Sequence, residues 1–192
     1  MTVLIKNGRV LNPAENLDET LDILIQDGII KEKSKSINVT ADRIIDAKGC
    51  YVMPGLIDLH VHFRDPGLTH KADIASESRA AVLGGITSFI DMPNTIPPTV
   101  TAEALEAKLK VASEYSWANY GFNIGATNAN ADEIIGCIET DFRHSIGGVK
   151  VFMGSSTGNM LVDRKESLEK LFSISTKPVL VHSEDESIIK AN

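Results

Sequence analysis

The sequence predicts an α/β protein, namely part of a TIM-type (β/α) barrel preceded by strands of a small β-sandwich domain. Two observations lead to this prediction. Before residue 54 the chain consists of short apolar runs separated by turn residues, as in small sheets. After residue 54 short apolar runs alternate with helical patterns, which is the repeat of a parallel sheet. We therefore expect β-domain strands over residues 1–53 and the first five βα units of a barrel over 54–192.

The N-terminal region has the pattern of short antiparallel strands. Asn7-Gly8 and Asp27-Gly28 each lie between two apolar runs, and such pairs favour the two-residue turn of a β-hairpin. The segment 43–54, RIIDAKGCYVMP, continues in the same style. The region contains no cluster of residues suited to catalysis, so we expect it to be a structural module.

The barrel region contains five strand candidates separated by helical patterns. A helix is expected over residues 74–83, because Gly84-Gly85 is a helix stop, and the next begins near Thr101. The helix after the fourth strand should begin near Asp163, which has capping-box spacing to Glu166. The strand candidates are residues 55–61, 85–92, 120–126, 147–153 and 177–183.

Polar residues at the ends of these strands favour a barrel over a doubly wound sheet. Barrels of this kind build their sites from the C-terminal ends of strands and the loops that follow. A doubly wound dinucleotide-binding sheet would carry a glycine-rich phosphate loop after its first strand, and no such motif is present. The residues at strand ends are His60 and His62, Asp91 and Asn94, Lys150, and His182.

The segment 53–65, MPGLIDLHVHFRD, carries the most specific chemical pattern. Asp58, His60 and His62 alternate with apolar residues, so a strand places all three on one face. Two imidazoles one strand step apart can bind one divalent ion, and Asp58 can approach that ion or orient a ligand. The alternative is a pair of hydrogen-bonded core histidines. The strand context, Asp58 and the nearby Arg64 favour a metal site.

Lys150 and His182 are further candidate ligands. A lysine between Val149 and Val151 would usually extend to solvent, but an inward-facing ammonium beside a metal is costly. Carbamylation by carbon dioxide would turn Lys150 into an anionic carboxylate able to bridge two metal ions. His182 follows an apolar run, where a capping or core histidine is the alternative. His70 and His144 have no partner at ligand spacing and are expected at the surface.

The segment Gly154 to Gly158, GSSTG, matches the nucleophile elbow of serine hydrolases, with Ser156 as the nucleophile. In that fold the acid precedes the histidine along the chain, whereas here His182 precedes Asp185 and no later histidine follows. We therefore interpret GSSTGN as a loop over the strand ends.

Composition limits the remaining possibilities. The net charge of −7 and the pI near 5.2 argue against broad binding to nucleic acid or anionic membranes. The two cysteines are far apart and without C-x-x-C spacing, which is typical of reduced thiols. The sequence has neither a membrane-length apolar run nor a secretory h-region, so we expect a cytoplasmic protein.

The segment 54–98, PGLIDLHVHFRDPGLTHKADIASESRAAVLGGITSFIDMPNTIPP, resembles the amidohydrolase superfamily, and within it the dihydroorotases with a small β domain. The resemblance covers essentially all 192 residues, and HVHFRDPG with DMPNT is a specific pair of motifs. It implies a zinc enzyme that interconverts N-carbamoyl-L-aspartate and L-dihydroorotate in pyrimidine synthesis. Dimers are common in that family, so a homodimer is one expected assembly.

Residue roles follow from the resemblance, position by position. Two zinc ions are expected, although the sequence leaves the number and identity of the metals and the state of the lysine open. His60 and His62 would bind one zinc, carbamylated Lys150 would bridge both ions, His182 would bind the second, and Arg64 and Asn94 would hold the substrate carboxylate.

The sequence also departs from the family. A complete barrel has eight strands and about 250 residues, and the family's remaining zinc histidine and general-base aspartate lie on strands beyond the fifth. We expect a fragment that is inactive alone. Two alternatives stay open: a related amidase acting on hydantoins, dihydropyrimidines or allantoin, and a non-catalytic scaffold subunit. The presence of four candidate ligands argues against the scaffold.

Overall fold

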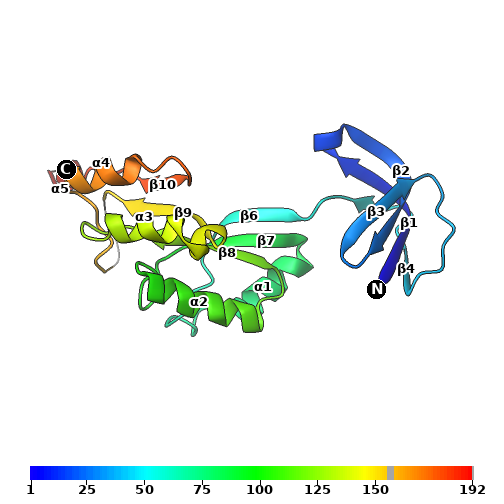
Figure 1. The fold of residues 1–192 in the computed structure, drawn as a ribbon, viewed down its shortest axis with the longest axis horizontal. Helices are drawn as coiled ribbons and strands as arrows, with labels where there is room; N and C mark the ends of the chain where they lie inside the picture. The colour runs from blue at the N-terminus through cyan, green and yellow to red at the C-terminus, as the bar shows by residue number, and fades with distance from the viewer. Residues whose placement is uncertain (155–157, 192) are drawn as a thin grey trace. The chain divides into compact units, whose positions relative to one another are not determined.

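The computed structural model describes residues 1–154 and 158–191 (Figure 1). Ser156, considered above as a nucleophile, lies outside the described residues. The chain divides into two compact units, Met1–Gly55 and Leu56–Asn192, and each is described by itself.

The first unit is a five-stranded sheet around the long strand β1 (Thr2–Asn12). A short 3₁₀ helix, η1 (Pro13–Glu15), connects β1 to its antiparallel partner β2 (Leu17–Gln26). Strand β3 (Ile29–Ser34) pairs with β2 across the Asp27-Gly28 turn, which confirms the hairpin predicted there. Strands β4 (Arg43–Asp46) and β5 (Tyr51–Val52) pair parallel with β1, so the expectation of antiparallel strands in this segment was wrong.

The hairpin predicted at Asn7-Gly8 was also wrong, because β1 continues through this pair. Asn7 has a φ of 61°, and the pairing of β1 with β2 shifts register between Ile5 and Gly8. This is a β-bulge, which needs the same permissive residues as a tight turn. The local sequence therefore does not distinguish the two.

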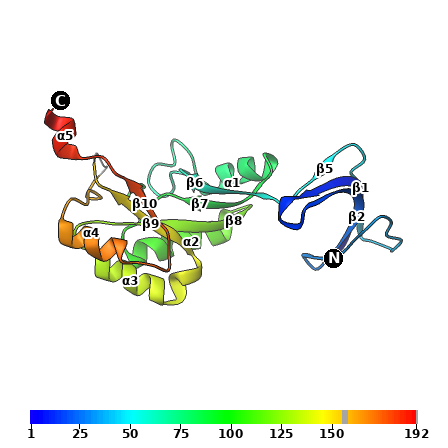
Figure 2. The ribbon, with the colours of Figure 1, turned by 90° about the horizontal axis from the view of Figure 1, so that it is seen from above.

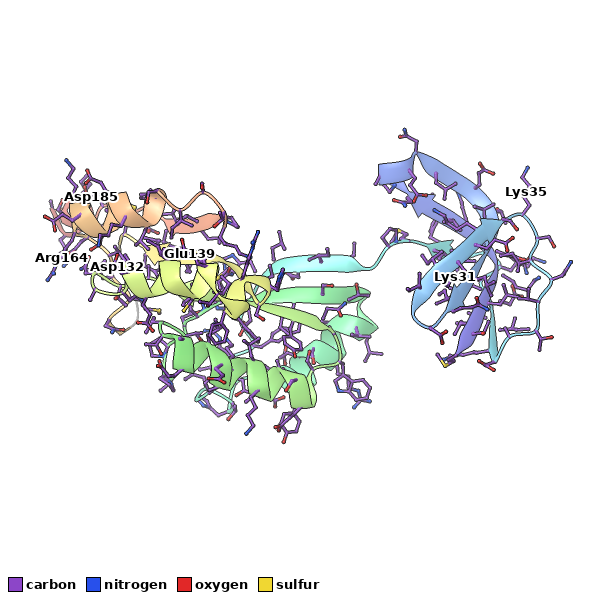
Figure 3. The ribbon with its side chains drawn as sticks, viewed as in Figure 1. Lys31, Lys35, Asp132, Glu139, Arg164 and Asp185 are labelled. Atoms are coloured by element: carbon purple, nitrogen blue, oxygen red, sulfur yellow. The ribbon has the colours of Figure 1, made fainter. Side chains whose placement is uncertain are left out.

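Charged side chains cover the free edge of the first sheet. Strand β3 is an outer strand, and Lys31 on it and Lys35 just beyond it are both exposed (Figure 3). Lysine on an edge strand discourages pairing with another chain.

The second unit contains a curled, parallel five-stranded sheet of order β10-β9-β8-β7-β6 (Figures 1 and 2). Strands follow one another in sequence order, with a helix between each strand and the next, which confirms the predicted α/β class and partial barrel. The elements are β6 (Leu56–Val61), α1 (Ile74–Leu83), β7 (Ile86–Asp91), α2 (Ala102–Tyr115), β8 (Asn119–Gly125), α3 (Ala131–Glu139), η2 (Asp141–His144), β9 (Ile146–Phe152), α4 (Lys165–Phe172), β10 (Val179–His182) and α5 (Glu186–Ala191).

The core of this unit lies where the strands pack against the helices. Phe89 of β7, Phe122 of β8 and Leu105 of α2 are all fully buried in one apolar cluster. Strand β6, in contrast, is an outer strand of the sheet, and its Ile57 and Leu59 are exposed. Because neighbouring strand residues point to opposite faces, Asp58 and His60 lie on the face of β6 opposite Ile57 and Leu59.

Helix starts follow the sequence in two cases and depart from it in one. Asp73 caps α1 by accepting from the Ser76 N–H at 2.8 Å, and Thr101 caps α2. The capping box predicted at Asp163 is absent, because α4 begins after Arg164 and its N-cap makes no side-chain bond. Among the residues described, none of the helices is long and apolar enough to cross a membrane.

Candidate functional site

The first group of candidate residues lies at the C-terminal ends of β6 and β7. His60 and His62 are exposed, and their ring centroids are 5.3 Å apart. His62 Nδ1 lies 2.9 Å from Asn94 Oδ1. A carbonyl oxygen can only accept, so Nδ1 donates, and Nε2 keeps the lone pair that a metal would need.

The environment of His62 favours its neutral form. Burial lowers the pKa of His62 first, and the positive charge of Arg64 lowers it further. The hydrogen bond that His62 donates to Asn94 raises this pKa without cancelling these effects. A neutral imidazole is the form that binds metals, so this environment suits a ligand.

The Asp58 side chain binds the backbone of its own strand. Its Oδ1 accepts from the backbone N–H of His60 at 3.0 Å, which fixes the strand just before the histidines. Within the described parts of the chain, no group of three or more His, Cys, Asp or Glu side chains is arranged to hold a metal. Asp58 therefore does not complete a three-residue site with His60 and His62.

The loops after β6 and β7 are locked together. The Ile96 N–H donates to the Pro66 carbonyl at 3.1 Å. Gly67 has a φ of 81°, and a Cβ built on it would lie 1.9 Å from the Ile96 carbonyl oxygen. Arg64 has a φ of 65°, a left-handed conformation that is unfavourable for a long side chain. This packing fixes the loop that carries Arg64 beside the loop that carries Asn94.

The second group lies on β9 and β10. Lys150 is only 3% exposed, and no ion pair with it occurs among the described residues. Its Nζ lies 4.9 Å from the centroid of the Phe152 ring. Burial lowers the pKa of Lys150, and the carboxylate of Glu184 raises it only in part. The ammonium form is thus disfavoured, and the neutral amine is the form that reacts with carbon dioxide.

His182 ends β10 beside these residues. It pairs with Phe152 in the sheet register, and the two rings have centroids 5.0 Å apart. Its Nδ1 lies 3.5 Å from Glu184 Oε1, and both side chains are about half exposed (47% and 46%). A carboxylate beside one imidazole nitrogen directs the other nitrogen toward a ligand.

The sheet therefore holds two half-sites, which we name the histidine half-site (His60, His62, Arg64 and Asn94) and the lysine half-site (Lys150, His182 and Glu184). The first lies at the C-terminal ends of β6 and β7 and in the loops after them, and the second on β9, on β10 and in the loop after β10. Strand β8 lies between them in the sheet. Their imidazole nitrogens are ligands of a type suited to zinc. His70 and His144 are exposed, in line with the surface positions expected for them.

The chain matches the Amidohydrolase family over residues 51–169, which include both half-sites except His182 and Glu184. The chain belongs to the amidohydrolase family. Its curated relatives include dihydroorotases. The one from Lactococcus lactis is 36% identical across 98% of this chain and 44% of that protein. The one from Aquifex aeolicus is 53% identical over 98 residues, which are 51% of this chain and 23% of that protein.

Solved structures similar to this amidohydrolase include the L-hydantoinase (dihydropyrimidinase) from Arthrobacter aurescens, with a TM-score of 0.87 and 33% identity. That match covers 98% of this chain and 42% of the hydantoinase. The dihydropyrimidinase from Brevibacillus agri has a TM-score of 0.81 and 26% identity, over 100% of this chain and 42% of that chain. The chain thus spans less than half the length of the relatives in these comparisons.

Sequence reasoning placed Asp91 among the strand-end residues and missed Lys108. The structure turns Asp91 away from the histidine half-site, toward α2, where Lys108 Nζ lies 2.6 Å from its Oδ2. Lys108 shares the buried face of α2 with Leu105 and Ala112. This helical spacing is the one feature of the sequence that could have indicated a buried lysine.

Proposed function

We propose that this amidohydrolase is the part of a zinc-dependent dihydroorotase that carries most of its metal ligands. The reaction is the reversible hydrolysis of L-dihydroorotate to N-carbamoyl-L-aspartate, a step of pyrimidine synthesis. The observation that supports it best is the histidine half-site, where a metal-ligand pair adjoins one arginine and one asparagine. The dihydroorotases among its relatives support the same substrate.

The proposed ligands are His60 and His62 for one zinc, Lys150 as a bridging carbamate, and His182 for the other. Zinc supplies a Lewis acid and lowers the pKa of water that it binds. Asn94 accepts the Nδ1 hydrogen of His62 at 2.9 Å and so orients the ring. Carbamylation joins the neutral Lys150 nitrogen to the carbon of carbon dioxide, opens one C=O π bond and releases one proton. The product is the anionic carbamate.

Arg64 is proposed to bind the substrate carboxylate. A guanidinium presents two parallel N–H groups that match a carboxylate, and the locked loop holds them in one place. Dihydroorotate carries a carboxylate on its ring, whereas the simple hydantoins and dihydropyrimidines do not. The arginine thus favours dihydroorotate.

The test uses the protein expressed from the complete open reading frame that encodes these residues. We expect about two zinc ions per chain, measurable by elemental analysis, and hydrolysis of dihydroorotate. His60→Ala should lose at least one metal and most of the turnover. A folded protein with neither zinc nor turnover would contradict the proposal. The non-catalytic scaffold subunit would then be the remaining alternative.

A hydantoinase is the second candidate, since the similarity to the Arthrobacter aurescens L-hydantoinase favours it. The same assay with hydantoin and dihydrouracil decides between the two. A protein that turns over these rings faster than dihydroorotate is a hydantoinase-type amidase.

A further inference from the structure

A buried ion pair lies behind the histidine half-site, and the proposed function does not use it. Lys108 Nζ of α2 and Asp91 Oδ2 at the end of β7 are 2.6 Å apart, and their side chains are 0% and 1% exposed. A buried ion pair is poor evidence for stability alone, because desolvation offsets the attraction.

The other oxygen of the carboxylate reaches the strand that carries the histidines. Asp91 Oδ1 accepts from the backbone N–H of Phe63, directly after His62, at 2.9 Å. The Phe63 ring is buried against Phe89, with centroids 4.5 Å apart. Phe63 is therefore held in the apolar core, whereas the side chain of the neighbouring His62 is exposed.

This side-chain bond strengthens the sheet pairing where it is irregular. The pairing of β6 with β7 is irregular between Asp58 and Val61, the stretch that contains His60. Beyond it, the Met92 N–H donates to the Val61 carbonyl at 3.0 Å. The peptide groups on both sides of His62 are thus held by Asp91 and Met92.

Lys108 secures both of these residues. Besides its contact with Asp91, its ammonium donates to the Met92 carbonyl at 3.1 Å and lies 4.9 Å from the centroid of the Phe122 ring. It neutralises a carboxylate that would be costly to bury alone. It also ties α2 to the end of β7.

We propose that Asp91 and Lys108 are positioning residues for the metal ligand His62, with Asp91 fixing the peptide after it and Lys108 neutralising Asp91. This inference rests on the proposed function in one respect, because it assumes that His62 binds zinc. The interaction that positions His62 is the hydrogen bond from the Phe63 N–H to Asp91. The positive charge of Lys108 only offsets the free-energy cost of burying the Asp91 carboxylate.

Two double variants separate the acceptor from the charges, again in the protein from the complete open reading frame. Asp91→Asn with Lys108→Met removes both charges and keeps an acceptor for Phe63. Asp91→Leu with Lys108→Met removes both charges and the acceptor. Each variant loses the same lysine, so their difference reports the hydrogen bond.

We expect Asp91→Asn/Lys108→Met to keep its zinc affinity within a few-fold of wild type. Asp91→Leu/Lys108→Met should lose about tenfold or more, measured by competition with a chelator. Hydrolysis of dihydroorotate should follow the same order. Equal zinc affinity and equal turnover in the two folded double variants would overturn the proposal. If the Leu variant does not fold, Asp91→Ala/Lys108→Met removes the same acceptor without adding volume.

A metal-free measurement keeps this inference distinct from the proposed function. Amide hydrogen exchange at Phe63 in zinc-free protein should be slow in wild type and in the Asn variant, and at least tenfold faster in the Leu variant. Unchanged exchange would also overturn the proposal. A wild-type protein that exchanges slowly at Phe63 but binds no zinc would contradict the proposed function, and with it the role of Asp91 toward a ligand.

Discussion

Asp22 is a buried acid that organises the first sheet. It is 3% exposed and accepts from the backbone N–H groups of Asn7 and Ile37 and from the ammonium of Lys6. Burial alone would raise the pKa of Asp22, but these three donors outweigh it and leave the pKa below its ordinary value. The ionised form is therefore bound more favourably in the folded sheet than in the unfolded chain.

We predict that Asp22→Asn lowers the free energy of unfolding by about 1–3 kcal/mol at pH 7, because an amide cannot accept from both N–H groups. Since folding lowers the pKa, the stabilisation is present above the unfolded value near 3.8 and is lost as pH falls below it. Urea unfolding at pH 7 and pH 3 measures the effect. The difference between wild type and variant should shrink at pH 3.

Asp18→Asn is the matched control for this experiment. Asp18 pairs with Arg9 on the surface, with side chains 53% and 54% exposed, so its substitution should change the free energy of unfolding much less than Asp22→Asn does. An equal effect of the two substitutions would contradict the role of burial.

Arg64 provides a second prediction at this scale. We expect Arg64→Met to raise the KM for dihydroorotate about tenfold or more, because a charged hydrogen-bond pair to the carboxylate is lost. Arg64→Lys keeps the positive charge but lacks the planar guanidinium, so its KM should lie between those of wild type and Arg64→Met. Steady-state kinetics gives both values. An unchanged KM in Arg64→Met would show that the carboxylate binds elsewhere.

Among the elements, the two locked loops are the part of the structure most sensitive to small changes. We predict that Gly67→Ala lowers the free energy of unfolding by about 2 kcal/mol or more and reduces turnover, because both the φ of 81° and the contact with Ile96 disfavour a side chain. Gly85→Ala is the control, since Gly85 has a φ of 89° but open space around it.

Gly85→Ala should therefore lose only about 1 kcal/mol, the cost of the backbone conformation. Chemical denaturation and dihydroorotate assays compare the two variants. Equal losses would mean that the contact between the loops contributes nothing.

The positions of helices and strands in the second unit could be predicted because helix stops and caps in the local sequence coincide with the observed ends of the elements. Gly84-Gly85 ends α1 at Leu83 as expected, and Thr101 caps α2. Features that depend on distant contacts could not. The helical spacing of Lys108 with Leu105 and Ala112 indicates the buried face of α2, but it does not indicate the partner Asp91. Asp163 forms no capping box because its Oδ1 accepts from Asn128 of the preceding loop at 2.8 Å.

The same limit applies to the candidate site. Alternation identified His60 and His62 as neighbours on one face, and the structure gives their rings 5.3 Å apart. The contact of Asn94 Oδ1 with His62 could not be read from the pattern, and the expected role of Asn94 toward the substrate carboxylate stays a prediction. Glu184 was missed, because its approach to His182 depends on how the loop after β10 turns. The alternation of residues along a strand predicts the face of the sheet on which a side chain lies. It does not predict which side chain a loop residue will contact.

At the scale of the whole molecule, all the proposed ligands belong to the second unit, Leu56–Asn192, and none to Met1–Gly55. We predict that zinc stabilises the second unit selectively, by about 2.7 kcal/mol at a free concentration of 100 times Kd. Hydrogen exchange with zinc and with a chelator, resolved by peptide, measures this. Equal slowing in both units would contradict the assignment of the ligands.

The contacts that hold the histidine strand end all come from one uninterrupted stretch, from β6 through α2. Phe63, Asp91, Met92 and Lys108 lie within it, whereas Lys150 and His182 follow much later in the chain. Local contacts form faster than distant ones, and synthesis proceeds from the N-terminus. Synthesis therefore produces every residue that holds the histidine half-site before it reaches Lys150 and His182.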